Sequence, residues 1–163
     1  MIGLSPIEAQ NIAHLRSIAL AAISDPRSDY DAPQTSAWLL NFPAPDDFHE
    51  RISSQKIVVA FDGASEEPVG FMTLRPDGLI DFAFIHPDHQ GSGHFRDMME
   101  GVEIQGRTLQ LPTLESRASR NAVGPFRACG FEVIAREAVQ LGAVELERFH
   151  VRKTLNTKLK ELL

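Results

Sequence analysis

Apolar residues recur with a helical period near the start of the chain. Between Ile12 and Ala22 an apolar residue returns every three or four positions, which predicts a helix with one buried face. Ser5-Pro-Ile-Glu8 is a start signal for this helix, because serine can cap it, proline suits its first turn and glutamate completes a capping box. Shorter helices are expected over 35–40 and 46–53, after breaks at prolines.

The pattern then changes to that of strands. Lys56–Phe61, Val69–Leu74 and Leu79–Ile85 are rich in β-branched and aromatic residues, and glycine-containing turns separate them. Three such strands joined by short turns predict an antiparallel meander. An apolar stripe over 95–102 then predicts a helix that ends at Gly106.

The remainder of the chain reads as strands interrupted by one short helix. A strand is expected over 109–116, and the helical crossover before it would place it parallel to Leu79–Ile85. A short helix over 121–129 and two strands over 131–140 and 145–155 follow. The predicted fold is therefore α+β: a mixed, mostly antiparallel central sheet flanked by helices, with a glycine loop between a strand and a helix.

Composition narrows the class of protein. The 163 residues are expected to form a single domain over 1–163. No apolar run approaches the roughly 20 residues that cross a bilayer, and the N-terminus shows no signal peptide, so we expect a cytoplasmic protein without a membrane partner. Cys129 is the only cysteine, which excludes an internal disulfide. The formal net charge of −6 argues against nucleic-acid binding.

A glycine loop, Gln90-Gly-Ser-Gly93, separates a predicted strand from a predicted helix. Pro87 ends the strand, because proline has no N–H to donate to a neighbouring strand. Such a loop directs free backbone N–H groups and the positive end of a helix dipole at one point. We therefore expect an anion-binding site here, although paired glycines also occur in ordinary turns.

Three motifs occur in a fixed order: Phe84-Ile-His-Pro-Asp-His-Gln-Gly-Ser-Gly93, Phe126-Arg-Ala-Cys-Gly-Phe131 and Glu147-Arg-Phe-His-Val-Arg-Lys-Thr-Leu155. The first resembles the pyrophosphate loop of the GNAT superfamily of acyl-CoA-dependent N-acyltransferases. The second resembles the Tyr-x-x-x-Gly-Phe motif of that family, and the third resembles its closing strand. The resemblance covers 56–155. In addition, Val69-Gly-Phe71 resembles the sequence found at this place in a subgroup of small bacterial acetyltransferases.

The resemblance implies that acetyl-CoA is the co-substrate and that an amine of a small molecule or peptide attacks its thioester directly. In this family the strand before the loop opens away from its neighbour, and pantetheine pairs with the freed backbone groups. By position, Phe84 and Ile85 would make these main-chain contacts, and Phe126 would pack on pantetheine. The residues expected to surround the pyrophosphate are Gln90, Gly91, Ser92, Gly93, His94 and Phe95.

Three positions depart from the family pattern. Phe95 stands where the loop usually has glycine or alanine, and its place in one apolar stripe with Met98 and Met99 predicts that the ring turns onto the sheet. Phe126 stands where the family has a tyrosine that protonates the departing thiolate, and phenylalanine has no proton to give. Ser119 stands where the family often has asparagine.

Acyl transfer to an amine needs a neutral nucleophile, a polarised thioester carbonyl and a proton for the sulfur. A backbone N–H near Ile85 is expected to polarise the carbonyl. Asp81 is the candidate general base, because strand alternation would place it on the face of Ile85 and burial disfavours the charged form of a carboxylate. The open alternative is that Asp81 is paired with a cation. The proton for the thiolate could come from Tyr30, Ser119 or water.

Aromatic and histidine residues near these motifs have two readings each. Tyr30 and Trp38, the single tyrosine and tryptophan, either pack in the core or line an acceptor pocket.

His86, His89 and His94 lie along the loop without the i, i+4 spacing of a helical ligand pair. We therefore expect solvated histidines and no metal. The arginines near the motifs either form a solvated face or contact CoA phosphates: Arg96, Arg117, Arg120 and Arg127.

Two functions stay open at this point. One is an acetyl-CoA-dependent N-acetyltransferase; the other is a non-catalytic protein of the same fold that binds acyl-CoA as a sensor or structural ligand. Phe95 and Phe126 keep the second in consideration. A P-loop nucleotide enzyme ranks third, behind both of these functions, because the Gly-x-x-x-x-Gly-Lys-Ser/Thr motif is absent. The resemblance also implies a possible homodimer, since many relatives pair through their C-terminal strands.

Overall fold

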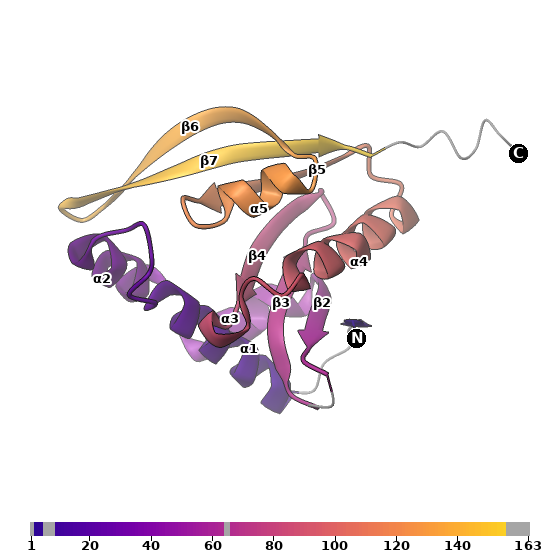
Figure 1. The fold of residues 1–163 in the computed structure, drawn as a ribbon, viewed down its shortest axis with the longest axis horizontal. Coiled ribbons are helices and arrows are strands. Elements are labelled where there is room, and N and C mark those ends of the chain that lie inside the picture. The colour runs from indigo at the N-terminus through magenta and orange to yellow at the C-terminus, as the bar shows by residue number, and fades with distance from the viewer. Residues whose placement is uncertain (1, 5–8, 64–65, 156–163) are drawn as a thin grey trace, which may run out of the picture.

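The computed structural model describes residues 2–4, 9–63 and 66–155, which form one seven-stranded sheet with helices packed against it (Figure 1). The strand order is β1-β2-β3-β4-β5-β7-β6. The strands are β1 (Ile2–Leu4), β2 (Lys56–Phe61), β3 (Pro68–Leu74), β4 (Leu79–Ile85), β5 (Thr113–Ser119), β6 (Glu132–Leu141) and β7 (Val144–Thr154). The helices are α1 (Ala9–Ile23), α2 (Ala32–Asn41), α3 (Pro45–Ser53), α4 (His94–Thr108) and α5 (Val123–Ala128), with a 3₁₀ turn, η1 (Pro87–His89). The α+β fold class predicted from the sequence is confirmed.

The strand pairing follows the predicted topology. β2, β3 and β4 form an antiparallel meander, and β5 pairs parallel with β4 after the crossover through α4. β7 lies between β5 and β6 and pairs antiparallel with both. In Figure 1 the long β6–β7 hairpin runs along one end of the molecule, and α2 packs against it. Within the described residues, no helix has the length and apolar character needed to cross a membrane.

Two apolar clusters hold helices to opposite faces of the sheet. Val58 belongs to the cluster under α4 and α5, whereas its neighbour Val59 belongs to the cluster under α1 and α3. Because successive side chains of a strand point to opposite faces, β2 and β3 are buried on both sides. Phe48 in one cluster and Met98 in the other are almost fully buried, and each such side chain contributes about 1.5–3 kcal/mol by leaving water.

The structure extends the prediction at two N-terminal elements. α2 begins before the predicted residue 35, because Asp31 caps it: the Asp31 carboxylate accepts the N–H of Gln34 at 2.8 Å, and the Gln34 side chain accepts the N–H of Asp31 at 3.0 Å. β1 was not predicted, since three residues are too few to show a period; it pairs with 58–60 of β2. The predicted capping box at 5–8 lies outside the described residues.

The predicted end of α4 at Gly106 is wrong. The helix continues to Thr108, and β5 spans Thr113–Ser119 rather than the predicted 109–116. A Cβ at position 106 would lie 2.9 Å from the Leu155 side chain, so this glycine permits close packing of helix on sheet instead of ending the helix. The other predicted elements agree to within the one or two residues by which element ends are ordinarily assigned.

β4 carries a bulge opposite Thr73 of β3. The register of β3 against β4 shifts by one residue between Met72 and Leu74. Thr73 lies at this point, and its hydroxyl accepts the backbone N–H of Phe82 at 3.1 Å. An extra residue bends a strand and increases its twist. β4 pairs with β5 only through 79–80, so the rest of β4 is separated from β5, as the family resemblance implied.

Candidate functional site

The glycine loop joins the end of β4 to the start of α4. Gly91 and Gly93 have φ angles of 78° and 84°, a backbone conformation that favours glycine. A Cβ at either position would have no atom within 4 Å, so both glycines face open space. Gly93 directly precedes α4, and the first N–H groups of a helix have no acceptor inside it. The loop therefore has the geometry of an anion site.

A cavity of about 480 Å³, here called the loop cavity, opens beside the glycine loop. It is enclosed by the end of β4, the loop, the residues before and in α5, and the connection between α1 and α2. Most residues that the sequence predicted to contact CoA line it: Phe84, Ile85, Gln90, Gly91, Gly93, His94 and Phe95. Ser92 is exposed and lies outside this lining, and Phe126 instead lines a second cavity.

The second cavity has a volume of about 430 Å³ and is lined by aromatic, charged and aliphatic side chains. We call it the aromatic cavity. The aromatic residues in its wall are Tyr30, Trp38, Phe42, Phe82, Phe84 and Phe126. The two cavities adjoin, because five residues line both of them: Trp38, Ala83, Phe84, Ser119 and Ala122. Their junction therefore lies beside the part of β4 that has separated from β5.

Asp81 lies in the aromatic cavity, but not in the orientation predicted. Its carboxylate accepts two N–H groups of the Arg51 guanidinium at 2.6 and 2.8 Å, and it accepts the side-chain amide of Gln55 at 2.7 Å. The prediction that Asp81 shares a face with Ile85 is wrong, because the bulge reverses the alternation between them. Ile85 packs against the cluster under α4, whereas Asp81 faces Arg51 of α3. The structure thus shows the cation-paired alternative.

Tyr30 is buried and links the α1–α2 connection to β7 through its hydroxyl group. Its hydroxyl donates to the carbonyl oxygen of Glu147 at 2.6 Å and accepts the backbone N–H of Arg120 at 3.0 Å. Burial raises the pKa of the Tyr30 hydroxyl above its ordinary value. Its ring packs edge to face on the ring of Trp38, with 5.5 Å between the centroids, and both rings line the aromatic cavity. The two aromatic residues therefore pack against each other and also form part of a cavity wall. A hydroxyl committed to a carbonyl is poorly placed to protonate a ligand.

Ser119 lies at the junction of the two cavities. It is the last residue of β5, and its hydroxyl accepts the backbone N–H of Ala122 at 3.2 Å. Among the described residues its hydroxyl donates to no protein atom, so its proton is available to a ligand. Of the predicted proton donors, Ser119 has the more favourable position.

The ring of Phe126 is buried and packs on the ring of Phe95. The Phe95 ring turns onto the core, as its apolar spacing predicted.

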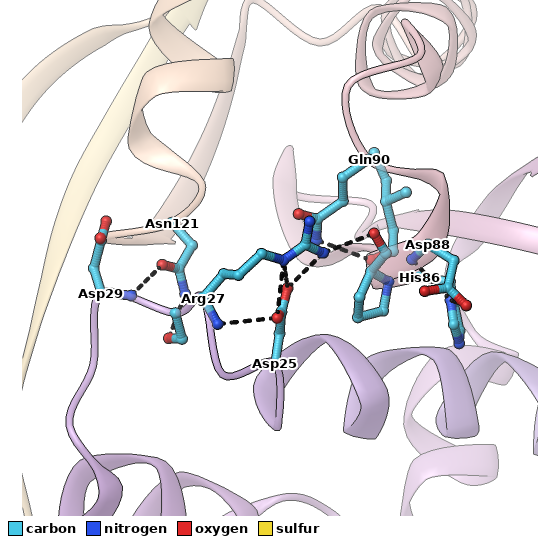
Figure 2. A network of polar contacts seen from close by, with 10 residues as sticks. Asp25, Arg27, Asp29, His86, Asp88, Gln90 and Asn121 are labelled. Carbon is cyan, nitrogen blue, oxygen red and sulfur yellow. Dashed lines mark hydrogen bonds and ion pairs between the residues drawn. The ribbon is translucent and has the colours of Figure 1, made fainter.

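A polar network closes one side of the loop cavity (Figure 2). Arg27 forms a bidentate ion pair with Asp25, which lowers the pKa of that carboxyl, and it also donates to the carbonyl oxygen of Pro87 at 2.8 Å. Asn121, before α5, accepts the N–H of Asp29 at 2.9 Å. The connection over 25–31 therefore bridges the glycine loop and the start of α5. No motif in the sequence predicted this bridge.

Two of the arginines that the sequence raised as phosphate contacts form ion pairs elsewhere. Arg117 pairs with Glu137 at 3.3 Å, and Arg120 pairs with Glu147 at 3.3 Å. None of Arg96, Arg117, Arg120 and Arg127 lines the loop cavity. Among the described residues, the arginine in that lining is Arg27. The arginine beside the loop cavity thus comes from the connection over 25–31, and not from the segments that carry the family motifs.

Comparisons with known proteins agree with this fold. Residues 26–146 match a family model described as an acetyltransferase (GNAT) domain. No curated protein matches the chain in sequence. Among solved structures, the chain is similar to a GCN5-related N-acetyltransferase from Rhodopseudomonas palustris, with 27% identity and a TM-score of 0.83 over 94% of this chain and 95% of that one.

Two more distant structures show the same fold. One is a GNAT phosphinothricin acetyltransferase from Sinorhizobium meliloti in complex with acetyl-CoA, with 15% identity and a TM-score of 0.69 over 94% of this chain and 88% of that one. The other is the PaiA N-acetyltransferase from Thermoplasma acidophilum in complex with coenzyme A, with 13% identity and a TM-score of 0.70 over 94% and 99%. With the family match spanning most of its length, the chain belongs to the GNAT acetyltransferase family.

Proposed function

We propose that this protein is an acetyl-CoA-dependent N-acetyltransferase that acts on a primary amine of a small molecule. The observation that carries the proposal is the junction of the two cavities beside the unpaired part of β4. Acetyl-CoA would enter through the loop cavity and the amine through the aromatic cavity. The thioester and the nitrogen would then meet at the residues common to both linings, around Ser119 and Phe84.

The loop cavity suits the CoA half of the reaction. Its glycine loop offers backbone N–H groups to the pyrophosphate, and the positive end of α4 favours the negative charge. β4 has no partner strand on the β5 side beyond Ile80, so pantetheine would pair with β4 there, in place of the Gln90 side chain that donates to the carbonyl oxygen of Ile85 at 3.3 Å. Solved relatives of the same fold contain acetyl-CoA or coenzyme A, which supports this assignment.

The aromatic cavity suits a small acceptor. Its volume of about 430 Å³ falls at the lower end of the range for small-molecule sites. Aromatic rings would cover the apolar body of the acceptor, while the Asp81–Arg51 pair and Glu147 supply charge in its wall. Both oxygens of the Asp81 carboxylate already accept hydrogen bonds, from Arg51 and from Gln55. Asp81 is therefore better suited to hold the incoming ammonium group than to withdraw its proton as a general base.

The chemical step balances with the groups present. The ammonium group of the acceptor first loses one proton to water in the open aromatic cavity. The neutral amine nitrogen then forms a bond to the acetyl carbonyl carbon, the carbon–sulfur bond breaks, and the sulfur leaves as a thiolate. The second proton lost by the nitrogen also passes to water in this cavity. The thiolate takes a proton from Ser119, which recovers one from water. A backbone N–H near Ile85 would stabilise the developing charge on the carbonyl oxygen.

A non-catalytic acyl-CoA sensor is the second candidate, because Phe126 replaces the tyrosine that serves as acid in this family. Calorimetric titration with acetyl-CoA, followed by a thiol-release assay over a panel of small amines, separates the two. Binding with amine-dependent release of CoA supports the enzyme. Binding without release across the panel supports the sensor. No binding at millimolar acetyl-CoA would refute both.

A further inference from the structure

Three side chains of types that can bind a metal ion lie close together beside the glycine loop. Asp62 follows β2, His89 ends η1 and His94 begins α4. One donor atom from each of them lies within 4.8 Å of the other two. His89 Nδ1 is 3.4 Å from an Asp62 carboxylate oxygen, and the rings of His89 and His94 are neighbours, with 6.5 Å between their centroids. The cluster thus joins the turn after β2 to both ends of the loop.

The sequence pattern gave no sign of this cluster. Histidines strung along a loop lack the fixed pair and the distant third ligand of a metal site, and no metal was expected. The third ligand comes from the turn between β2 and β3, far from the loop in sequence. Pairing of β3 with both β2 and β4 brings Asp62 to the end of β4. The convergence is therefore a consequence of the fold.

We propose that Asp62, His89 and His94 bind one Zn²⁺ ion. Two imidazoles and one carboxylate are a ligand set that zinc accepts, with a fourth position open to water or an anion. Zinc–nitrogen bonds of about 2.0 Å in tetrahedral geometry place neighbouring ligand atoms about 3.3 Å apart. Asp62 and His89 already have this spacing. His94 is only partly buried, so rotation of its side chain can complete the set.

Neighbouring residues fit this assignment. The His86 ring is adjacent to His89, but its Nδ1 accepts the backbone N–H of Asp88 at 3.2 Å and so belongs to the turn. Mg²⁺ and Ca²⁺ prefer sites made only of oxygen ligands, so two imidazoles select against them. His89 does not line the loop cavity, whereas His94 does. A bound zinc ion would therefore fix one wall of that cavity and add positive charge beside it.

Titration of the metal-free full chain with ZnCl₂ tests the site directly. We expect one Zn²⁺ per chain, with Co²⁺ giving the absorption spectrum of a four-coordinate nitrogen and oxygen site. His89→Ala and Asp62→Asn should each weaken Zn²⁺ binding at least tenfold. The matched control is His49→Ala, an exposed histidine on α3 whose loss should change nothing. Thermal unfolding of each variant confirms that it is folded.

Equal Zn²⁺ affinity in the wild type and in His89→Ala would overturn the proposal, and so would tight binding of Mg²⁺ in place of Zn²⁺. A second arm rests on the proposed function: Zn²⁺ should tighten acetyl-CoA binding severalfold in the wild type and not in His89→Ala. The results distinguish a failure of the metal site from a failure of the proposed function. Zn²⁺ binding without acetyl-CoA binding refutes the proposed function alone, and acetyl-CoA binding without Zn²⁺ binding refutes the metal site alone.

Discussion

The ring of Phe95 packs edge to face on the ring of Phe126, with 5.1 Å between the centroids and 83° between the planes. Phe126 packs in the same manner on Phe131 at 5.0 Å. Phe95 and Phe126 are both departures from the family pattern, and the structure brings them into contact. The bulk at position 95 is thereby held against the core beside α4 and α5, and the glycine loop keeps its open face.

Replacing Phe95 by alanine should therefore affect stability more than binding. Loss of a partly buried ring and its aromatic contact is expected to lower the free energy of unfolding by about 1–3 kcal/mol. The affinity for acetyl-CoA should change less than threefold. Denaturant unfolding and calorimetry measure the two effects, and Ile104→Ala, at an exposed position of α4, is the control for helix content. Acetyl-CoA binding that becomes more than tenfold tighter would mean that the ring obstructs the site.

Valine at Gly91 should abolish acetyl-CoA binding while the protein still folds. A β-branched residue at positive φ costs roughly 1–2 kcal/mol, and its side chain would enter the space where the pyrophosphate is proposed to bind. Gly142→Val is a matched control, because Gly142 has a φ of 61°, also has open space around its Cβ position, and lies in the β6–β7 turn. Both variants should lose similar stability, but only Gly91→Val should lose acetyl-CoA affinity. Equal affinities in the two variants would refute the loop assignment.

Much of the fold could be predicted from the sequence because its strands carry clear periods and its turns carry glycine or proline. The meander from β2 to β4 and the parallel return of β5 follow from these local signals. The glycine loop was located for the same reason. Its position between a strand and a helix is a local property of the chain, and the resemblance to a known family implied that the anion is the CoA pyrophosphate.

The details of the site could not be predicted, because they depend on contacts between distant segments. The face of Asp81 was wrong because a single extra residue at the β4 bulge reverses the alternation, and nothing in the local sequence marks that bulge. Arg27 reaches Pro87 only through the folded path of 25–31. Asp62 meets the loop histidines through two strand pairings. Each of these relations depends on how the whole chain folds and not on the local sequence.

Replacing Asp81 by asparagine should weaken acceptor binding and stability together. Arg51 would lose its charged partner, and hydrogen bonds to charged groups are each worth about 1.5–3 kcal/mol. We expect KM for the amine to rise about tenfold, with little change in the affinity for acetyl-CoA. Asp77→Asn removes the exposed pair with Arg75 and should change neither quantity. A thousandfold fall in kcat at unchanged stability would instead identify Asp81 as the general base.

Replacing Tyr30 by phenylalanine separates a structural hydroxyl from a catalytic one. The hydroxyl holds the carbonyl of Glu147 and the N–H of Arg120, and leaving buried backbone groups unpaired costs about 1–3 kcal/mol each. We expect lower stability and a kcat within about threefold of the wild type. Ser119→Ala should show the opposite pattern, with near-normal stability and a lower kcat. A large fall in kcat for Tyr30→Phe at unchanged stability would make Tyr30 the acid.

Replacing Arg27 by methionine should speed the release of acetyl-CoA. The side chain is exposed, so stability should change little, but the bridge from 25–31 to the glycine loop would lose its bond to Pro87. We expect the dissociation rate to rise between three- and tenfold in stopped-flow measurements. Arg107→Met, which removes an i, i+4 pair on α4, is the control. Arg27→Lys distinguishes two causes: it keeps the charge but not the fork geometry, so wild-type kinetics in this variant would mean that Arg27 acts through charge on the phosphates rather than as a tether.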